Sequence, residues 1–150
     1  MLTKFSAQLF AVGYITTHGK TELLNLESGQ WKTADSYPYG SYIFVAPVVY
    51  YQTSFIMFGG SSDNSNNIIA GFDEKSEKWT KLGELNKPRW GSAAVEVSNG
   101  FLITGGRGTY ETEFCKYSDN QQITCSEKPP SMTDYAWYPE IFFVTEDFCK

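Results

Sequence analysis

The chain has 150 residues, which is one ordinary domain on length alone, and 41% of them are hydrophobic, enough to form a core. Its formal net charge is −5 with no basic cluster, which argues against nucleic-acid binding, because phosphate contacts need concentrated Lys and Arg. No apolar run reaches the roughly 18 residues that span a bilayer. Aromatic residues make up 17% of the chain, and such side chains suit β-strands.

The N-terminal stretch "MLTKFSAQLFAVGY" contains one Lys and a weak apolar patch that Ser6 and Gln8 interrupt. No small-residue cleavage site follows it cleanly, so it does not match a secretory signal peptide. We interpret "LFAVGY" as a strand of a first repeat unit, with Val12-Gly13 in place of a Gly pair. The one histidine, His18, falls in a predicted loop and is interpreted as a solvated turn residue.

An internal repeat follows. A Trp ends each of two charged turns, "NLESGQW" at Trp31 and "FDEKSEKW" at Trp79, and an apolar residue, Leu24 or Phe72, lies seven positions before it. Gly pairs close two apolar runs, and they recur at the same spacing, at Gly59-Gly60 and Gly105-Gly106. A third copy, "EFCKYSDNQQITC", places Cys125 where Trp79 stands.

Each unit contains four short apolar runs separated by turn residues. In the second unit we expect strands over roughly residues 43–51, 54–60, 67–72 and 78–82. Four strands in a repeat of this length predict an all-β propeller blade; a single β-sandwich is the alternative. Helical repeats of similar length do not fit, because no window shows a 3.6-residue period.

An ordered set of residues resembles the kelch repeat family: Gly59-Gly60, Phe72-Asp73, Trp79, Pro88-Arg89, Ser92-Ala93 and Gly105-Gly106. The second unit fits best, the first lacks the Gly pair and the third lacks the Trp. The resemblance covers nearly the whole chain. It implies a kelch-type propeller segment of about three four-stranded antiparallel blade units, at approximately 1–42, 43–90 and 91–138, with a further blade starting in 139–150.

The resemblance also assigns structural roles. In a kelch blade the strand that ends in the Gly pair is second from the centre. We expect these glycines to adopt positive φ and to leave room for the Trp and aromatic side chains of a neighbouring blade. Trp31 and Trp79 are expected to pack between blades. Because propellers close with about 4–8 blades, three units predict a fragment of a longer protein, or else closure through an oligomer.

Cys115 and Cys125 lie five residues on either side of Asn120. If Asn120 centres a hairpin, the two are directly cross-strand, with Cβ atoms ~4.5–5.5 Å apart, which is close to disulfide distance. Our hypothesis is a Cys115–Cys125 disulfide in place of the missing Trp, and the alternative is two buried free thiols. A disulfide would favour an oxidising compartment, but the sequence leaves the compartment open.

The sequence offers little for catalysis. It has no nucleophile-elbow motif and no Cys-x-x-Cys spacing for a metal, and we expect no enzymatic activity, metal or cofactor. Some kelch-like propellers are copper oxidases, whose sites need more than one His. Such an activity would require catalytic residues outside this segment.

Binding of a partner protein fits the sequence better than catalysis does. In a four-stranded meander the loops after the second and fourth strands emerge on one face. Arg, Tyr and Trp are enriched in binding hot spots, and we expect about half of the aromatics on this face to pack beneath their own loops. Arg89 has the alternative role of bonding loop carbonyls. The candidate partner-binding residues are Tyr37, Tyr39, Arg89, Trp90, Arg107, Tyr110, Tyr135 and Trp137.

We therefore predict a protein–protein interaction module that binds a partner protein through this loop face. The alternatives are an extracellular adhesion or scaffold propeller, an intracellular ligase adaptor, and part of a kelch-like oxidase. The other expected contacts are with further blades of the same chain or with an oligomer.

Overall fold

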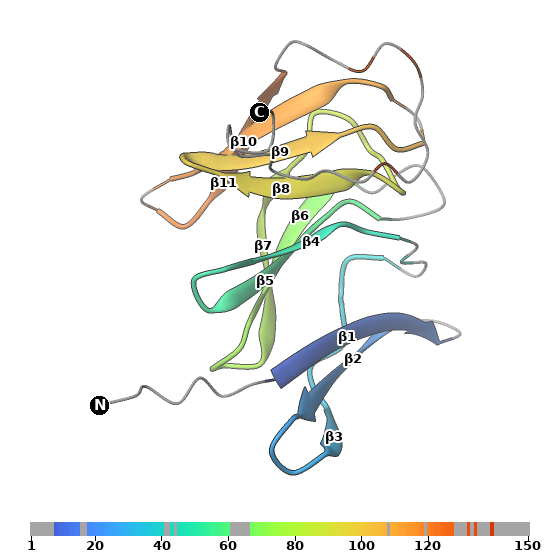
Figure 1. Cartoon of the computed structure of the whole chain (residues 1–150), viewed down its shortest axis with the longest axis vertical. Coiled ribbons are helices and arrows are strands. Elements are labelled where there is room, and N and C mark those ends of the chain that lie inside the picture. Colours follow the sequence, from blue (N-terminus) through green and yellow to red (C-terminus); the bar gives the residue numbers. More distant parts are fainter. Residues whose placement is uncertain are drawn as a thin grey trace, which may run out of the picture.

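A computed structural model describes residues 8–15, 18–40, 43, 45–60, 67–107, 109–118, 120–127, 132, 134 and 139. This part of the chain is all β and contains eleven strands and no helix (Figure 1). It therefore holds no helix of the length and hydrophobicity that a membrane crossing requires.

The strands follow one another as three antiparallel meanders. The first meander comprises β1 (Gln8–Ile15), β2 (His18–Asn25) and β3 (Gln30–Thr33). The second comprises β4 (Val48–Tyr51), β5 (Ser54–Phe58), β6 (Ile68–Asp73) and β7 (Lys78–Glu84). The third comprises β8 (Ala93–Val97), β9 (Gly100–Thr104), β10 (Thr112–Tyr117) and β11 (Ile123–Glu127).

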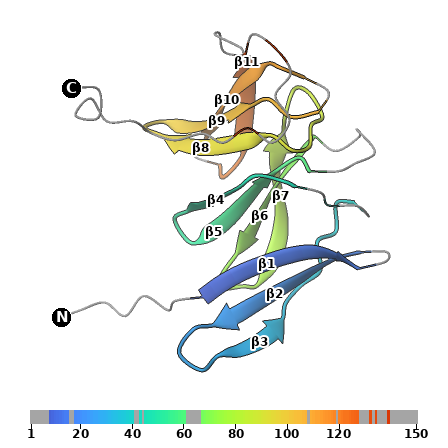
Figure 2. The same cartoon turned by 45° about the vertical axis from the view of Figure 1, so that its right-hand side comes forward.

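The meanders succeed one another along the long axis of the molecule (Figures 1 and 2). A short parallel pairing of β7 with β11, through Gly83–Ile123 and Glu84–Thr124, joins the second and third meanders into one eight-stranded sheet. The first meander forms a separate three-stranded sheet. Successive antiparallel meanders of this kind make the fold propeller-like.

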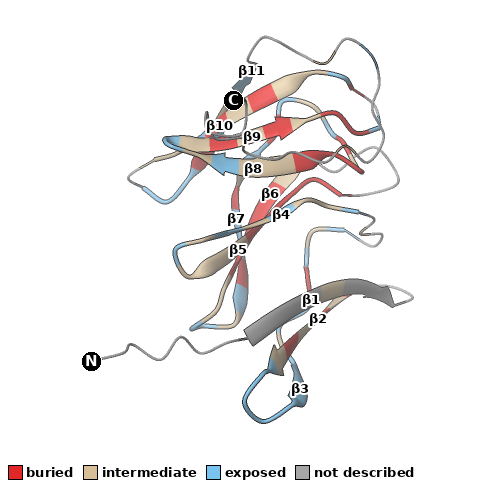
Figure 3. Cartoon of the chain, viewed as in Figure 1, coloured by how far each residue is buried: buried red, intermediate tan, exposed pale blue. Residues whose placement is uncertain are grey.

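The core lies between the meanders. The C-terminal half of β5 is buried on both faces, because side chains alternate across a strand: Met57 belongs to the cluster shared with the first meander, and Ile56 and Phe58 belong to the cluster shared with the third. The buried residues, red in Figure 3, are most numerous in the second and third meanders. The cluster between the first and second meanders contains Leu23, Tyr37, Met57, Ala70, Phe72 and Trp79. The cluster between the second and third contains Ile56, Phe58, Ile69, Leu82, Leu85, Phe101, Ile103, Cys115 and Ile123.

The strands of the second meander differ from prediction mainly at their ends. β4 begins at Val48 rather than at residue 43, because Val45 has a φ of 44° and Pro47 has no N–H to donate. β5 ends at Phe58, before the Gly pair, while β7 runs on to Glu84 past an irregularity in its register with β6.

Two expectations about the first meander are wrong. Val12-Gly13 lies inside β1, where Gly13 pairs with Lys20, and so it does not end a strand as a Gly pair would. His18 begins β2 and pairs with Ile15, and so it is not a loop residue. The paired strands β1 and β2 thus extend to Ile15 and His18, into the segment where the sequence indicated a loop.

The Gly pairs adopt positive φ as expected, at 67° and 97° for Gly59 and Gly60 and at 65° and 94° for Gly105 and Gly106. The second expectation, room for an aromatic side chain of a neighbouring blade, is wrong. A Cβ on Gly60 would lie 2.3 Å from the Cβ of Ala46, and one on Gly106 would lie 2.9 Å from the backbone oxygen of Trp90. The second glycine of each pair therefore packs against the segment that enters its own meander.

Gly60→Ala is therefore expected to destabilise the chain more than Gly29→Ala. Gly29 also has positive φ, at 68°, but a Cβ there would have open space around it. The strained backbone alone costs about 1–3 kcal/mol, and only Gly60→Ala adds the collision with Ala46. Urea denaturation of both variants measures the difference, and equal losses would show that the close approach is unimportant.

The two tryptophans of the repeat, Trp31 and Trp79, differ in burial. Trp79 is 7% exposed and packs between the first two meanders, so its predicted role is confirmed. Trp31 is 53% exposed, and the expectation that it packs between blades is wrong for this structure. Trp31 is exposed because it lies on a face of β3 that no described segment covers.

Candidate functional site

A buried ion pair organises the loops at one end of the second and third meanders. Arg89, which lies between β7 and β8, contacts Glu113 of β10 at 2.5 Å, and both side chains are fully buried. Arg89 Nη1 also donates to the backbone oxygens of Glu111, at 2.8 Å, and Gly105, at 3.3 Å. One side chain therefore ties the 85–92 segment to the loop between β9 and β10.

The Glu113 carboxylate accepts further hydrogen bonds. The backbone N–H of Asn86 donates to it at 2.7 Å and the Asn86 side-chain amide at 3.1 Å, and the backbone N–H of Lys87 donates at 3.3 Å. Burial lowers the pKa of Arg89, and the negative charge of Glu113 acts in the opposite direction. A buried charge needs such partners to be tolerated, so this network fixes both loops.

The two loops that this network joins also carry polar and aromatic side chains. The guanidinium carbon of Arg107 lies 5.4 Å from the centre of the Trp90 ring, within cation–π range. The backbone N–H of Arg107 donates to the Trp90 oxygen at 2.8 Å and so fixes the pair. Arg107 and Tyr110 are exposed, and Lys87 pairs with Glu111 at 2.5 Å. We call Lys87, Trp90, Arg107, Tyr110 and Glu111 the loop cluster.

Several predicted binding residues lie elsewhere. Tyr37 is 1% exposed, its ring lies 4.9 Å from that of Trp79, and half-buried Tyr39 packs on it at 5.5 Å. Tyr37 belongs to the cluster between the first two meanders, so its assignment to a binding surface is wrong. Tyr39 packs against the same cluster but is only half-buried, so its assignment stays a prediction. Arg89 is wrong as a surface residue too, and its alternative role as a donor to loop carbonyls is confirmed.

Trp90 and Arg107 come together in the loop cluster. Tyr110 is exposed on the same β9–β10 loop as Arg107, while Tyr135 and Trp137 lie outside the described residues. Sequence reasoning missed Lys87, Glu111 and Glu113. A signal did exist for Glu113: it precedes Cys115 by two positions in a strand, so it shares the inward face of that predicted core residue.

The Cys115–Cys125 register is as predicted. The two residues are directly cross-strand partners on β10 and β11, with Cα atoms 4.0 Å apart, and the structure joins their sulfurs in a disulfide. Cys115 and Cys125 occupy the positions that Phe72 and Trp79 occupy in the second meander. The cross-strand partner of Cys115 on β9 is Phe101, just as the partner of Phe72 on β5 is Phe55. The alternative of two free thiols does not hold in this structure.

Glu113 lies beside the disulfide, and the possible ligand atoms of Glu113, Cys115 and Cys125 are within 4.8 Å of one another. Both sulfurs are used in the disulfide and the carboxylate is paired with Arg89. These three groups therefore do not offer a metal ion an open coordination set.

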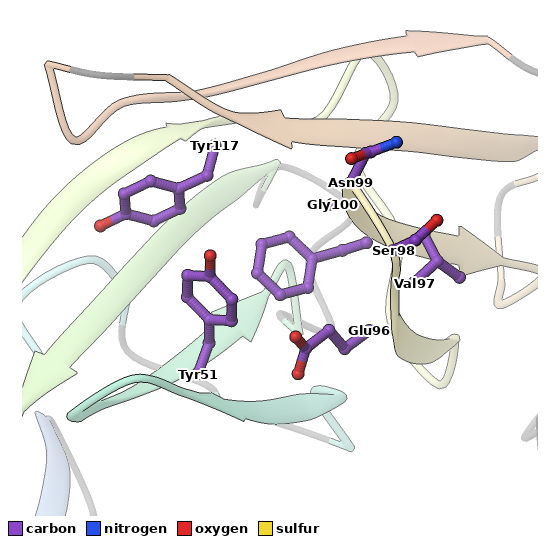
Figure 4. Close-up of a pocket in the computed structure, with 8 residues that line it drawn as sticks. Tyr51, Glu96, Val97, Ser98, Asn99, Gly100 and Tyr117 are labelled. Atoms are coloured by element: carbon purple, nitrogen blue, oxygen red, sulfur yellow. The ribbon is translucent and has the colours of Figure 1, made fainter.

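A cavity of about 250 Å³ opens at the opposite end of β9 (Figure 4). The Tyr51 ring lies 5.4 Å from that of Phe101 and 5.5 Å from that of Tyr117, so the aromatic side chains pack on one another. Burial raises the pKa of Tyr117, and Tyr51 adds to the effect. The lining residues are Tyr51, Glu96, Val97, Ser98, Asn99, Gly100, Phe101 and Tyr117.

This cavity is the weaker candidate for a binding site. Its volume lies below the roughly 300–1,000 Å³ of typical small-molecule pockets, and Phe101 is fully buried. The loop cluster, which presents an arginine stacked on an indole, is the better candidate.

Comparison with known proteins supports the fold. No family model matches the sequence, and no curated protein matches it either. A solved structure entitled "Structure of YjhT" resembles the chain with a TM-score of 0.58 at 12% sequence identity, covering 85% of this chain and 53% of that one. This chain therefore spans about half the length of that structure, and the likeness concerns the fold.

Proposed function

We propose that the chain is a segment of a kelch-type β-propeller, with about three blade units, that binds a partner protein through the loop cluster. The repeated Gly pairs with positive φ and the recurring register of Leu24–Trp31, Phe72–Trp79 and Cys115–Cys125 support the repeat assignment. The division into units at 1–42, 43–90 and 91–138 is supported by the order of the strands, of which three are described in the first unit and four in each of the others.

One observation carries the binding proposal: Arg107 is exposed and stacked on Trp90, on loops that the buried Arg89–Glu113 pair holds in place. A surface fixed before binding loses less conformational entropy on association, which favours affinity. Tyr110, on the same loop as Arg107, adds an exposed aromatic ring. We infer binding by shape and hydrogen-bond complementarity, with no covalent chemistry.

The disulfide favours a second, related function. Disulfides persist in oxidising compartments, so the Cys115–Cys125 bond supports an extracellular adhesion or scaffold propeller over an intracellular adaptor. Both functions use the same surface, and they differ in the compartment where the partner would be found.

Arg107→Ala is expected to weaken partner binding about 30-fold or more, because a stacked Arg at the centre of an interface is worth roughly 2 kcal/mol. The test is affinity capture with the chain as bait, followed by mass spectrometry. Lys75→Ala is the control: it removes an exposed cation from the turn between β6 and β7, at the other end of the meander. Loss of captured proteins with both variants, or with neither, would contradict the assignment of the surface.

A further inference from the structure

The cavity at the start of β9 is lined by aromatic side chains from two meanders. Tyr51 ends β4 of the second meander. The third meander contributes Glu96 of β8, Phe101 of β9 and Tyr117 of β10. The Tyr51 ring lies 5.4 Å from the Phe101 ring and 5.5 Å from the Tyr117 ring. Three aromatic rings therefore line one space of about 250 Å³.

Glu96 places a carboxylate beside these rings. It is directly cross-strand from Phe101, and such partners share a face of the sheet, with Cβ atoms ~4.5–5.5 Å apart. Figure 4 shows its carboxylate extending toward Tyr51. Alternation along β8 thus puts a charge on the inward face of this strand, the face from which Ala94 packs against the core between the second and third meanders.

The second meander has a different arrangement at the equivalent positions. Tyr50 corresponds to Glu96, because each lies the same distance before the Gly pair of its meander. Glu74 corresponds to Tyr117 through the register of β6 and β10. The Tyr50 hydroxyl donates to the Glu74 carboxylate at 3.1 Å. In the third meander the acid and the tyrosine have exchanged places, and within the described part of the chain they form no hydrogen bond with each other, so the cavity opens beside both.

The charges around the cavity favour a cation. Its described lining contains the carboxylate of Glu96 and no Lys, Arg or His. Lys116 is next to Tyr117 in the chain but points to the other face of β10, where its ammonium lies 5.6 Å from the centre of the Phe114 ring. No described cation therefore neutralises Glu96, and the net charge of −5 adds to the attraction for a positive ligand.

A neighbouring cavity has the same polarity. It also contacts Tyr117, has a volume of about 280 Å³, and contains Asp73 with no Lys, Arg or His in its described lining. The backbone N–H of Ser76 donates to Asp73 at 2.7 Å and lowers the pKa of this carboxyl group, so Asp73 is ionised near neutral pH. Two cavities that share Tyr117 thus each contain a negative charge, which raises the local concentration of cations.

A quaternary ammonium group fits the lining of the first cavity better than a protonated amine. The faces of aromatic rings attract cations, and several rings together recognise methylated ammonium groups. A primary ammonium is strongly hydrated and has three N–H donors to satisfy, whereas a quaternary ammonium has none. The volume, below the roughly 300–1,000 Å³ of typical small-molecule pockets, suits a compact head group.

We propose that the cavity at the start of β9 binds a quaternary alkylammonium group, carried by a trimethylated lysine side chain or by a free molecule of the choline type. The aromatic rings contact its methyl groups, and Glu96 supplies the counter-charge. The loop cluster lies beyond the other end of β9, so this site is separate from it and does not rest on the proposed function.

Titration of the isotope-labelled 150-residue chain with choline, followed by amide NMR spectroscopy, tests the proposal. We expect the amide signals of Asn99 and Gly100 to shift, with a dissociation constant of about 1 mM or lower, which is within reach of a ligand of so few atoms. The amide of Arg107, in the loop cluster, should not shift. The neutral isostere of choline, in which a carbon replaces the charged nitrogen, should bind at least about tenfold more weakly.

Two sets of variants separate the charge from the rings. Glu96→Gln keeps the shape but removes the counter-charge, and it is expected to weaken choline binding about threefold to fivefold. Glu27→Gln, which changes an exposed carboxylate in the turn between β2 and β3, is the matched control and should have no effect. Tyr117→Leu should weaken binding about tenfold, while Tyr117→Phe keeps the ring and should bind almost as the parent does. Circular dichroism checks that each variant is folded.

A peptide with trimethyllysine and its unmodified counterpart identify the source of the ammonium group. Tighter binding of the trimethyllysine peptide than of choline would assign the site to a modified side chain of a partner, and the reverse would assign it to a free small molecule. Four results would overturn the proposal: no shift at millimolar choline, equal binding of choline and its neutral isostere, equal binding of choline and ethanolamine, and equal effects of Glu96→Gln and Glu27→Gln.

Discussion

Glu113→Ala is expected to lower the free energy of unfolding by about 3–5 kcal/mol, because it leaves the guanidinium of Arg89 buried without its counter-charge. Both side chains are fully buried, and Arg89 would keep only backbone oxygens as acceptors. The N–H groups of Asn86 and Lys87 would lose their acceptor as well. Such a loss is a large share of a typical domain stability of about 5–15 kcal/mol, and urea denaturation followed by tryptophan fluorescence measures it.

Glu111→Ala is the matched control for this prediction. Glu111 pairs with Lys87 at the same 2.5 Å distance, but both side chains are partly exposed, and such pairs contribute about 1 kcal/mol or less. A double change, Arg89→Met with Glu113→Leu, should recover most of the stability, because a buried pair can often be replaced by apolar side chains of similar volume. Equal losses for the two single variants would show that burial of the pair is unimportant.

The repeat made much of the local structure predictable. Turn chemistry and alternation indicated the strands of the second meander, and the symmetric spacing around Asn120 predicted the Cys115–Cys125 register, because a hairpin pairs residues equidistant from its centre. Positive φ at the Gly pairs followed from their place at strand ends. These features depend on residues close together in the chain.

Several of the failed predictions concern which surface covers which side chain. Tyr37 and Trp31 are both aromatic residues near β3, yet one is buried against Trp79 and the other is exposed. Alternation along a strand assigns a residue to a face, but the packing of another meander decides whether that face is covered. Arg89 and Glu113 are 24 residues apart, and a lone Glu in a strand gives no indication of a partner at that distance.

Replacing Cys115 and Cys125 together by Ala is expected to lower the free energy of unfolding by about 2–3 kcal/mol. The bond closes a loop with a sequence separation of 10 residues, and cross-linking a loop of this size removes about that much entropy from the unfolded chain. Cys115 is fully buried between the second and third meanders, so the lost sulfur contacts add to the effect. Thermal and urea denaturation of the two proteins measure the difference.

Reduction separates the contribution of the disulfide crosslink from that of the buried sulfur contacts. Dithiothreitol should lower the midpoint of the parent chain and leave that of the Cys115→Ala/Cys125→Ala variant unchanged, because only the parent has this bond to break. The loss on reduction should be smaller than the loss in the variant, since reduced thiols keep their core contacts. A parent midpoint that does not move under full reduction would show that the bond adds nothing to stability. The third meander would then depend on its apolar contacts and on the Arg89–Glu113 pair alone.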